Sequence, residues 1–274
     1  MRERILISGE AGSGKTNALF SIIEGVLLEG KENIFYMDHD LGAERFLYRV
    51  GKNHFDADNP EGRFHYYQCP DWITTRNAYR DVRRQWNRGD WFMEDRVDLV
   101  WDWVQHYFNA LVNELSEDEL DQVYLARRVA TRKQLADTDK PKKDVSPEGD
   151  IGGVDWAPIK NAYNTVGYDA FCGVESASRQ INVVMTALAK SKSEVYRPQG
   201  MTRADPRDLS GFGVVVQGEK NLPSLTDTHL LLEKSPIKGY VMHTVKNRER
   251  NMWRDVELDE RGFYLIYQQK TGEK

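Results

Sequence analysis

The chain is poor in the features that mark secreted and membrane-spanning proteins. Only two cysteines, Cys69 and Cys172, occur in 274 residues, so no disulfide framework is implied and a reducing compartment fits best. No uncharged apolar run approaches the roughly 20 residues that cross a bilayer, and no apolar segment of the signal-peptide kind opens the chain. We therefore expect a cytoplasmic protein with no membrane partner.

Positive charge and familiar catalytic patterns are also scarce. The formal net charge is -5, with 30% charged residues, so the whole molecule does not coat nucleic acid through bulk charge. Any DNA contact must come from a local patch or loop. The histidines show no H-E-x-x-H spacing, and the chain has no G-x-S-x-G element, heptad array or internal repeat. No such constellation therefore competes with the motif at the start of the chain.

That motif is "GEAGSGKT", residues 9–16, which satisfies G-x-x-x-x-G-K-[ST]. The apolar run "RILIS" precedes it, and "TNALFSIIEGVLLEG" follows with apolar residues at helical spacing. In a strand, glycine-rich turn and helix, backbone N–H groups and the helix amino terminus converge on phosphates. The pattern predicts a loop that binds ATP through Gly9, Glu10, Ala11, Gly12, Ser13, Gly14, Lys15, Thr16 and Asn17.

Two side chains of this loop have expected roles. Lys15 is expected at an exposed turn, where its charge neutralises the β- and γ-phosphates. Thr16 is expected to hold Mg²⁺.

Further strands follow the loop. The apolar run Ile34 to Met37 ends in Asp38-His39-Asp40, "RFHYYQCPD" indicates a second strand, and "TTRNAYRDVRRQW" a helix. We interpret "RVDLVWDW", residues 96–103, as a strand that ends at Asp102. An acid at the carboxyl end of a buried strand is where a second Mg²⁺-organising carboxylate belongs, so Asp102 is the predicted metal partner of Thr16.

The order of these pieces resembles the RecA-type recombinase and helicase ATPases, and most of all the phage-encoded RecA-like proteins. The resemblance implies that Asp40, in Asp38-His39-Asp40, polarises the attacking water. It implies that Thr186, at the end of the strand from Ile181, senses the γ-phosphate. It also implies that Lys246 and Arg248, in "VKNRER", reach the ATP of a neighbouring subunit, although a solvated basic turn at a hairpin remains the alternative.

Two segments depart from a minimal core. An insertion at about 104–153 begins with helical periodicity that predicts two helices, followed by a Pro-, Gly- and charge-rich linker or an element that orders on binding. A mobile loop at about 190–220 carries cations and rings suited to single-stranded DNA, although an ordinary surface loop remains possible. These residues are Lys190, Lys192, Arg197, Arg203, Arg207 and Lys220, with Tyr196 and Phe212 among them.

We therefore expect a single α/β domain over residues 1–274: a RecA-like P-loop NTPase core whose mainly parallel, twisted sheet is flanked by helices. A C-terminal β-hairpin, "HLLLEK" against "GYVMHTVKN" and "WRDVEL", should extend the sheet. The expected function is Mg²⁺-dependent ATP hydrolysis by a homo-oligomer on single-stranded DNA, in phage-type recombination or annealing in the host cytoplasm. The alternatives are a nucleotide or small-molecule kinase and an ATP-switched packaging or assembly protein.

Overall fold

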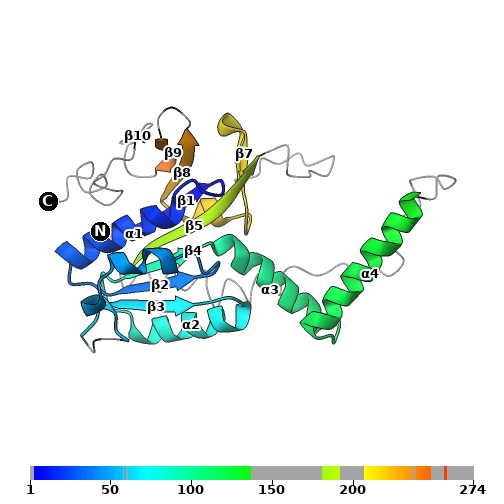
Figure 1. The fold of residues 1–274 in the computed structure, drawn as a ribbon, viewed down its shortest axis with the longest axis horizontal. Coiled ribbons are helices and arrows are strands. Elements are labelled where there is room, and N and C mark those ends of the chain that lie inside the picture. The colour runs from blue at the N-terminus through cyan, green and yellow to red at the C-terminus, as the bar shows by residue number, and fades with distance from the viewer. Residues whose placement is uncertain are drawn as a thin grey trace. The chain divides into compact units, whose positions relative to one another are not determined.

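A computed structural model of the chain describes residues 3–57, 59, 61–136, 181–191, 207–235, 237, 239–247 and 256–257 (Figure 1). The chain divides into two compact units. One comprises Met1–Trp101 with Asn164–Lys274, and the other is Asp102–Tyr163. The second unit contains the whole of the expected insertion at 104–153.

A mixed, mainly parallel sheet forms the centre of the larger unit. Its strand order is β10-β9-β8-β1-β5-β4-β2-β3, and every neighbouring pair from β8 to β3 is parallel. The strands are β1 (Arg4–Gly9), β2 (Ile34–Asp38), β3 (Phe64–Gln68), β4 (Trp91–Asp95), β5 (Asn182–Ser191), β8 (Thr228–Ser235), β9 (Gly239–Asn247) and β10 (Val256–Glu257). The predicted α/β class with a mainly parallel sheet is confirmed.

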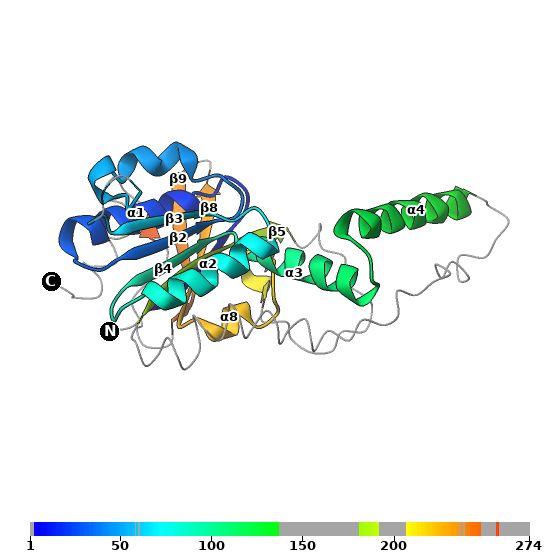
Figure 2. The same cartoon turned by 90° about the horizontal axis from the view of Figure 1, so that it is seen from below.

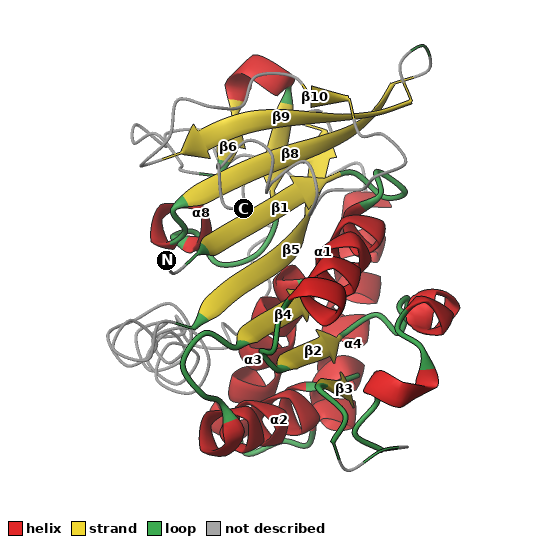
Figure 3. Cartoon of the chain, turned by 90° about the vertical axis from the view of Figure 1, so that its left-hand side faces the viewer, coloured by secondary structure: helices red, strands yellow, loops and turns green. Residues whose placement is uncertain are grey.

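Helices flank this sheet (Figures 2 and 3). Helix α1 (Lys15–Glu29) packs its apolar side chains with one set of alternating strand residues, among them Ile5 and Met93. Helix α2 (Trp72–Gln85) places Tyr79 against Phe92, the neighbour of Met93 in β4. Because successive strand residues point to opposite faces, α1 and α2 cover opposite faces of the sheet.

Short elements complete the larger unit. Two 3-10 helices, η1 (Glu44–Arg49) and η2 (Lys52–His54), follow β2, and η1 contacts α1. Helix α2 begins with a capping box in which the Asp71 carboxylate accepts from the Thr74 backbone N–H at 2.7 Å. A further short helix, α8 (Leu222–Leu225), leads into β8.

The interpretation of residues 96–103 as a strand was wrong. The strand is β4, Trp91–Asp95, and Val97–Val112 forms helix α3. In "RVDLVWDW" the apolar residues fit an alternating pattern when this short window is read alone. Over the longer segment the buried residues Val97, Val100 and Val104 recur at intervals of three and four, which is the helical period.

The smaller unit supplies the second helix of the insertion. Helix α4 (Glu117–Ala136) begins at a capping box, because Ser116 Oγ accepts from Glu119 N and the Glu119 carboxylate accepts from Ser116 N. Two helices were predicted here, and α3 and α4 confirm them. The expected linker after α4 lies outside the described residues.

The segment expected as a mobile loop at 190–220 is partly sheet. Strand β5 continues to Ser191, and β6 (Asp208–Leu209) and β7 (Val214–Val216) add to it in the antiparallel order β5-β7-β6, with the 3-10 turn η5 (Ser210–Phe212) between them. Residues 192–206 lie outside the described part of the chain.

The expected C-terminal hairpin is confirmed: β9 runs antiparallel to β8, and β10 pairs with β9. None of the described helices is both long enough and apolar enough to cross a bilayer.

Candidate nucleotide site

The glycine-rich loop, residues 9–17, joins β1 to α1 at the carboxyl end of the sheet. Gly12 and Gly14 have φ values of 76° and 93°, the left-handed region that side chains with a Cβ disfavour. Gly9 is small for a different reason, because a Cβ there would lie 2.5 Å from the Leu232 carbonyl oxygen of β8. The glycines therefore give the loop its shape and let it approach β8 closely.

Lys15 is the first residue of α1, and its ammonium turns back under the loop. Its Nζ donates to the carbonyl oxygens of Gly9 at 2.9 Å and Glu10 at 2.8 Å. The prediction that Lys15 lies at an exposed turn was wrong, because the residue is only 7% exposed. Burial lowers the pKa of the amine, while the nearby Asp95 carboxylate acts in the opposite direction. The Lys15 ammonium is therefore already placed within the loop before any anion binds there.

Thr16 connects the loop to the end of β4. Its hydroxyl donates to Asp95 Oδ2 at 2.7 Å, and the Tyr36 hydroxyl donates to the same oxygen at 3.0 Å. Asp95 is completely buried, and its other carboxylate oxygen accepts from the Thr186 hydroxyl. Burial raises the pKa of Asp95, and the hydrogen bonds from Thr186 and Thr16 limit the rise.

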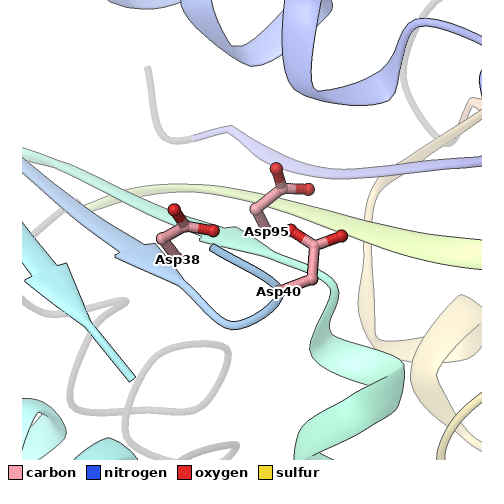
Figure 4. Close-up of side chains that lie close together, drawn as sticks. All are labelled: Asp38, Asp40 and Asp95. Atoms are coloured by element: carbon pink, nitrogen blue, oxygen red, sulfur yellow. The ribbon is translucent and has the colours of Figure 1, made fainter. Parts of the chain in front are cut away.

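Asp38, Asp40 and Asp95 converge at the ends of two neighbouring parallel strands (Figure 4). Each offers a carboxylate oxygen, and these oxygens all lie within 4.8 Å of one another. The buried Asp38 Oδ1 has no hydrogen-bond partner among the described residues, while Oδ2 accepts from Tyr66 and from the Ala43 N–H. Burial raises the Asp38 pKa.

A hard divalent cation fits these residues. Mg²⁺ prefers oxygen ligands and is bound through one or two carboxylates together with substrate phosphates. The Thr16 hydroxyl, the Asp95 carboxylate and the partnerless Asp38 oxygen are oxygen donors of that kind, and a cation would offset the mutual repulsion of the three acids.

Asp40 lies at the exposed side of the acid cluster. Its Oδ1 accepts from the Gly42 N–H at 3.0 Å, and its Oδ2 lies 3.4 Å from Nη1 of Arg96. The side chain is therefore near the Mg²⁺-suited residues while remaining open to solvent.

A cavity of about 540 Å³ opens beside these groups, within the size range of small-molecule sites. Most of the predicted loop residues line it, namely Ala11, Gly12, Gly14, Lys15, Thr16 and Asn17. Asp40 and Arg96 line it as well. Glu10 and Ser13 line a second cavity of about 370 Å³ together with Ala11.

The sequence misassigned the acid at the end of the strand. Asp102 is exposed in the helical segment of α3, in the smaller unit, whereas Asp95 contacts Thr16. The signal that identifies Asp95 is the short apolar run "WFMED", which ends in two acids. Sequence reasoning also missed the partnerless Asp38 oxygen and the ion pair between Arg96 and Asp40.

Thr186 lies inside the site. It is completely buried in β5, donates to Asp95, and its oxygen accepts from the backbone N–H of Arg96 at 2.8 Å. Its role as a γ-phosphate sensor stays a prediction.

Lys246 lies at the opposite end of the same sheet. It pairs with His229 across the hairpin, whereas Gly9 of the loop pairs with Leu232. Its Nζ donates to the carbonyl oxygens of Pro223, Ser224 and Thr226 at 2.7, 3.2 and 2.5 Å. Lys246 is therefore not among the groups that line the loop cavity, and Arg248 lies outside the described residues.

Only some of the basic residues expected to contact single-stranded DNA lie in the described part of the chain. Arg207 donates from Nη1 to the Gly218 carbonyl oxygen at 2.9 Å. Lys190 and Lys220 are exposed, while Lys192, Arg197 and Arg203 lie outside the described residues.

No protein-family model matches the chain, and a search of curated proteins returned no match either.

Proposed function

We propose that this protein is a Mg²⁺-dependent ATPase whose glycine-rich loop is a P-loop. The hydrogen bond from Thr16 to Asp95 carries the proposal. In P-loop NTPases a Ser or Thr of the loop and an Asp at a strand end hold the metal together. Here two residues of that kind, distant in the sequence, are already in contact.

The chain's own residues have distinct tasks in the proposed hydrolysis. Lys15 exchanges its loop carbonyls for β- and γ-phosphate oxygens. Asp40 orients a water molecule and takes its proton. Mg²⁺, when bound, would neutralise charge on the phosphate oxygens. The water oxygen bonds to the γ-phosphorus while the bond to the β,γ-bridging oxygen breaks, its electron pair leaving with ADP. The products are ADP and inorganic phosphate, and Asp40 returns its proton to solvent.

The kinase alternative receives less support. It needs arginines on a lid over the nucleotide, and "RDVRRQW", residues 80–86, is a segment with clustered arginines. Arg83 and Arg84 lie in the last turn of α2, a helix packed on the sheet through Tyr79 and Val82. These arginines are part of a structural helix.

The finer part of the proposal is RecA-like action by an oligomer. It is supported by the order of the strands. Strand β5 lies between the loop strand β1 and β4, the strand that ends in Asp95, and β8 lies on the other side of β1 and continues the sheet into the antiparallel strands β9 and β10. A role of Lys246 toward a neighbouring subunit rests on the sequence resemblance, and its Nζ donates to carbonyl oxygens of its own chain. Single-stranded DNA as partner rests on the sequence of residues 190–220 alone.

A matched pair of Thr16 variants tests the ATPase proposal. Thr16→Ser keeps the hydroxyl, whereas Thr16→Val removes it at nearly the same volume. We expect Thr16→Ser to retain Mg²⁺-dependent ATP binding and phosphate release, and Thr16→Val to lose about 10²-fold or more in turnover. Equal activity of the two variants would contradict the proposal. Phosphate release with and without single-stranded DNA then separates the DNA-coupled ATPase from the switch and kinase alternatives.

A further inference from the structure

The residue that follows Asp95 has an unusual backbone. Arg96 has a φ of 68°, a left-handed conformation that few residues other than glycine adopt. The conformation turns its N–H to Thr186 Oγ1 at 2.8 Å, directly beside the Asp95 carboxylate. Non-glycine residues in this region concentrate at functional sites, where the surrounding structure holds them.

The Arg96 guanidinium is anchored by a buried acid. Its Nε and Nη2 donate to the Asp98 carboxylate at 3.1 and 2.9 Å. Asp98 is 3% exposed, and its Oδ1 also accepts from the Leu188 N–H at 3.0 Å. Because a guanidinium is planar, two hydrogen bonds from its Nε and Nη2 to one carboxylate also fix the direction in which Nη1 points.

The remaining edge of the guanidinium faces the nucleotide cavity. Nη1 lies 3.4 Å from Asp40 Oδ2, and Arg96 lines the cavity together with Lys15 and Thr16. The chain thus places a permanent cation between the acid expected to orient water and the residues expected to hold Mg²⁺ and the phosphates.

We propose that Arg96 contacts the γ-phosphate of the chain's own bound ATP, with Asp98 as its positioning residue. The inference rests on the proposed ATPase function and names how that site distinguishes ATP from ADP. Lys15 reaches both the β- and γ-phosphates, whereas Arg96 lies on the Asp40 side, where the attacking water must stand. Only a triphosphate extends far enough to meet it.

The same geometry couples binding to catalysis. Without a triphosphate, Arg96 neutralises Asp40. A γ-phosphate offers more negative charge to Nη1, so the guanidinium shifts to it while Asp98 retains the opposite edge. Asp40 then accepts the proton of water, and the Arg96–Asp40 pair reforms when inorganic phosphate leaves. Arg96 donates hydrogen bonds throughout and transfers no proton.

The test compares triphosphate and diphosphate affinity in Arg96→Asn, since Asn tolerates the left-handed backbone. We expect the affinity for a non-hydrolysable ATP analogue to fall about 10-fold or more, because a charge-assisted hydrogen bond is lost. The affinity for ADP should change by less than about 2-fold, since Arg96 has no contact with it. Phosphate release should fall about 10³-fold, the lower end for arginines that stabilise phosphoryl transfer. Arg96→Lys should recover little, because an ammonium cannot span Asp98 and phosphate.

Arg4→Gln is the matched control, because Arg4 forms an equivalent two-contact pair with Asp227 at the other end of β1. It should leave both affinities unchanged. Circular dichroism verifies folding, and Arg96→Gly, which accepts a positive φ, replaces Arg96→Asn if the latter unfolds. An unchanged ratio of ATP to ADP affinity in a folded Arg96 variant overturns the inference alone. Failure of the wild type to bind either nucleotide overturns the ATPase proposal as well.

Discussion

The two ends of the central sheet differ in how completely their buried polar groups are hydrogen-bonded to one another. At the carboxyl end of β1, β2 and β4, three carboxylates face one another within 4.8 Å, and a buried oxygen of Asp38 has no hydrogen-bond partner among the described residues. Among the described residues, three non-glycine residues have a positive φ, and two of them follow acids of this cluster directly: Leu41 after Asp40 and Arg96 after Asp95.

At the amino end of the strands, polar groups satisfy one another. Arg4 holds Asp227 with two hydrogen bonds of 2.7 and 2.5 Å. The buried Asp90 accepts from the backbone N–H groups of Asn33 and Asn87, at 2.9 and 2.7 Å. The Asn182 amide bridges Glu3 N and the Gly89 carbonyl oxygen.

The difference separates stability from function within one sheet. Satisfied buried polar groups stabilise a fold, whereas unpartnered groups and like charges cost free energy unless a ligand compensates for them. The carboxyl end keeps groups that a cation and an anion would satisfy, which is the expectation for a binding site. The predictions below challenge this division, from the largest expected effect to the smallest.

Lys15→Ala should produce the largest effect, a loss of ATP hydrolysis of about 10³-fold or more, because the phosphates lose their buried cation. The Gly9 and Glu10 carbonyl oxygens also lose their donor, so we expect a cost of about 1–3 kcal/mol in unfolding free energy. Phosphate release and urea unfolding measure the two effects. Lys31→Ala, on the exposed loop after α1, is the control. Wild-type turnover in folded Lys15→Ala would refute the site at this end of the sheet.

Asp95→Asn and Asp102→Asn test the corrected acid. Asp95→Asn keeps the shape of the side chain but removes the charge next to Thr16, so we expect about 10²-fold slower turnover and a steeper Mg²⁺ requirement. Asp102→Asn, in the exposed part of α3, should leave the Mg²⁺ titration near that of the wild type. The reverse ranking of the two variants would restore Asp102 as the metal residue.

Opposite signs of stability change are expected at the two ends. Asp38→Asn removes one of three neighbouring carboxylates and should raise the unfolding free energy by about 1 kcal/mol without Mg²⁺. Asp90→Asn weakens acceptors for backbone N–H groups and should lower it by about 1–3 kcal/mol. Urea unfolding in chelator compares the two variants, and a loss in both would mean that the acid cluster is not strained.

Much of the larger unit could be predicted from local pattern. The apolar run before the glycine-rich loop, the helical spacing after it and the run from Ile34 each gave the observed element. These signals are strong because their periodicity persists over the whole element. The strand "WFMED" is only five residues long, and the alternation just after it imitated a strand.

The site was less predictable, because it depends on contacts between distant segments. Gly9 packs on the Leu232 carbonyl oxygen, and a Cβ at Gly14 would meet the Tyr240 ring at 3.3 Å, so late strands of the chain lie against the loop that contains Lys15. The link from Thr16 to Asp95 spans 79 residues. No local sequence pattern predicts these contacts between distant segments, and none predicts the left-handed backbone of Arg96.

The last prediction concerns His229 and acid stability at the amino end. His229 is buried in β8, its ring bonds Ser8 Oγ at 2.8 Å, and burial, aided by the charge of Lys246, lowers its pKa to about 3. The unfolded chain has the ordinary value of 6.5, so between these values it binds a proton that the folded state does not. The stability that depends on neutral His229 is therefore fully present above pH 6.5. It decreases as the pH falls towards 3, by up to about 1.4 kcal/mol of unfolding free energy per pH unit.

His229→Gln should flatten this slope between pH 6 and about 4, while lowering the unfolding free energy by about 1–2 kcal/mol at neutral pH through lost packing. Urea unfolding at several pH values measures it, with His54→Gln in η2 as control, and an unchanged slope would show that His229 does not limit acid stability.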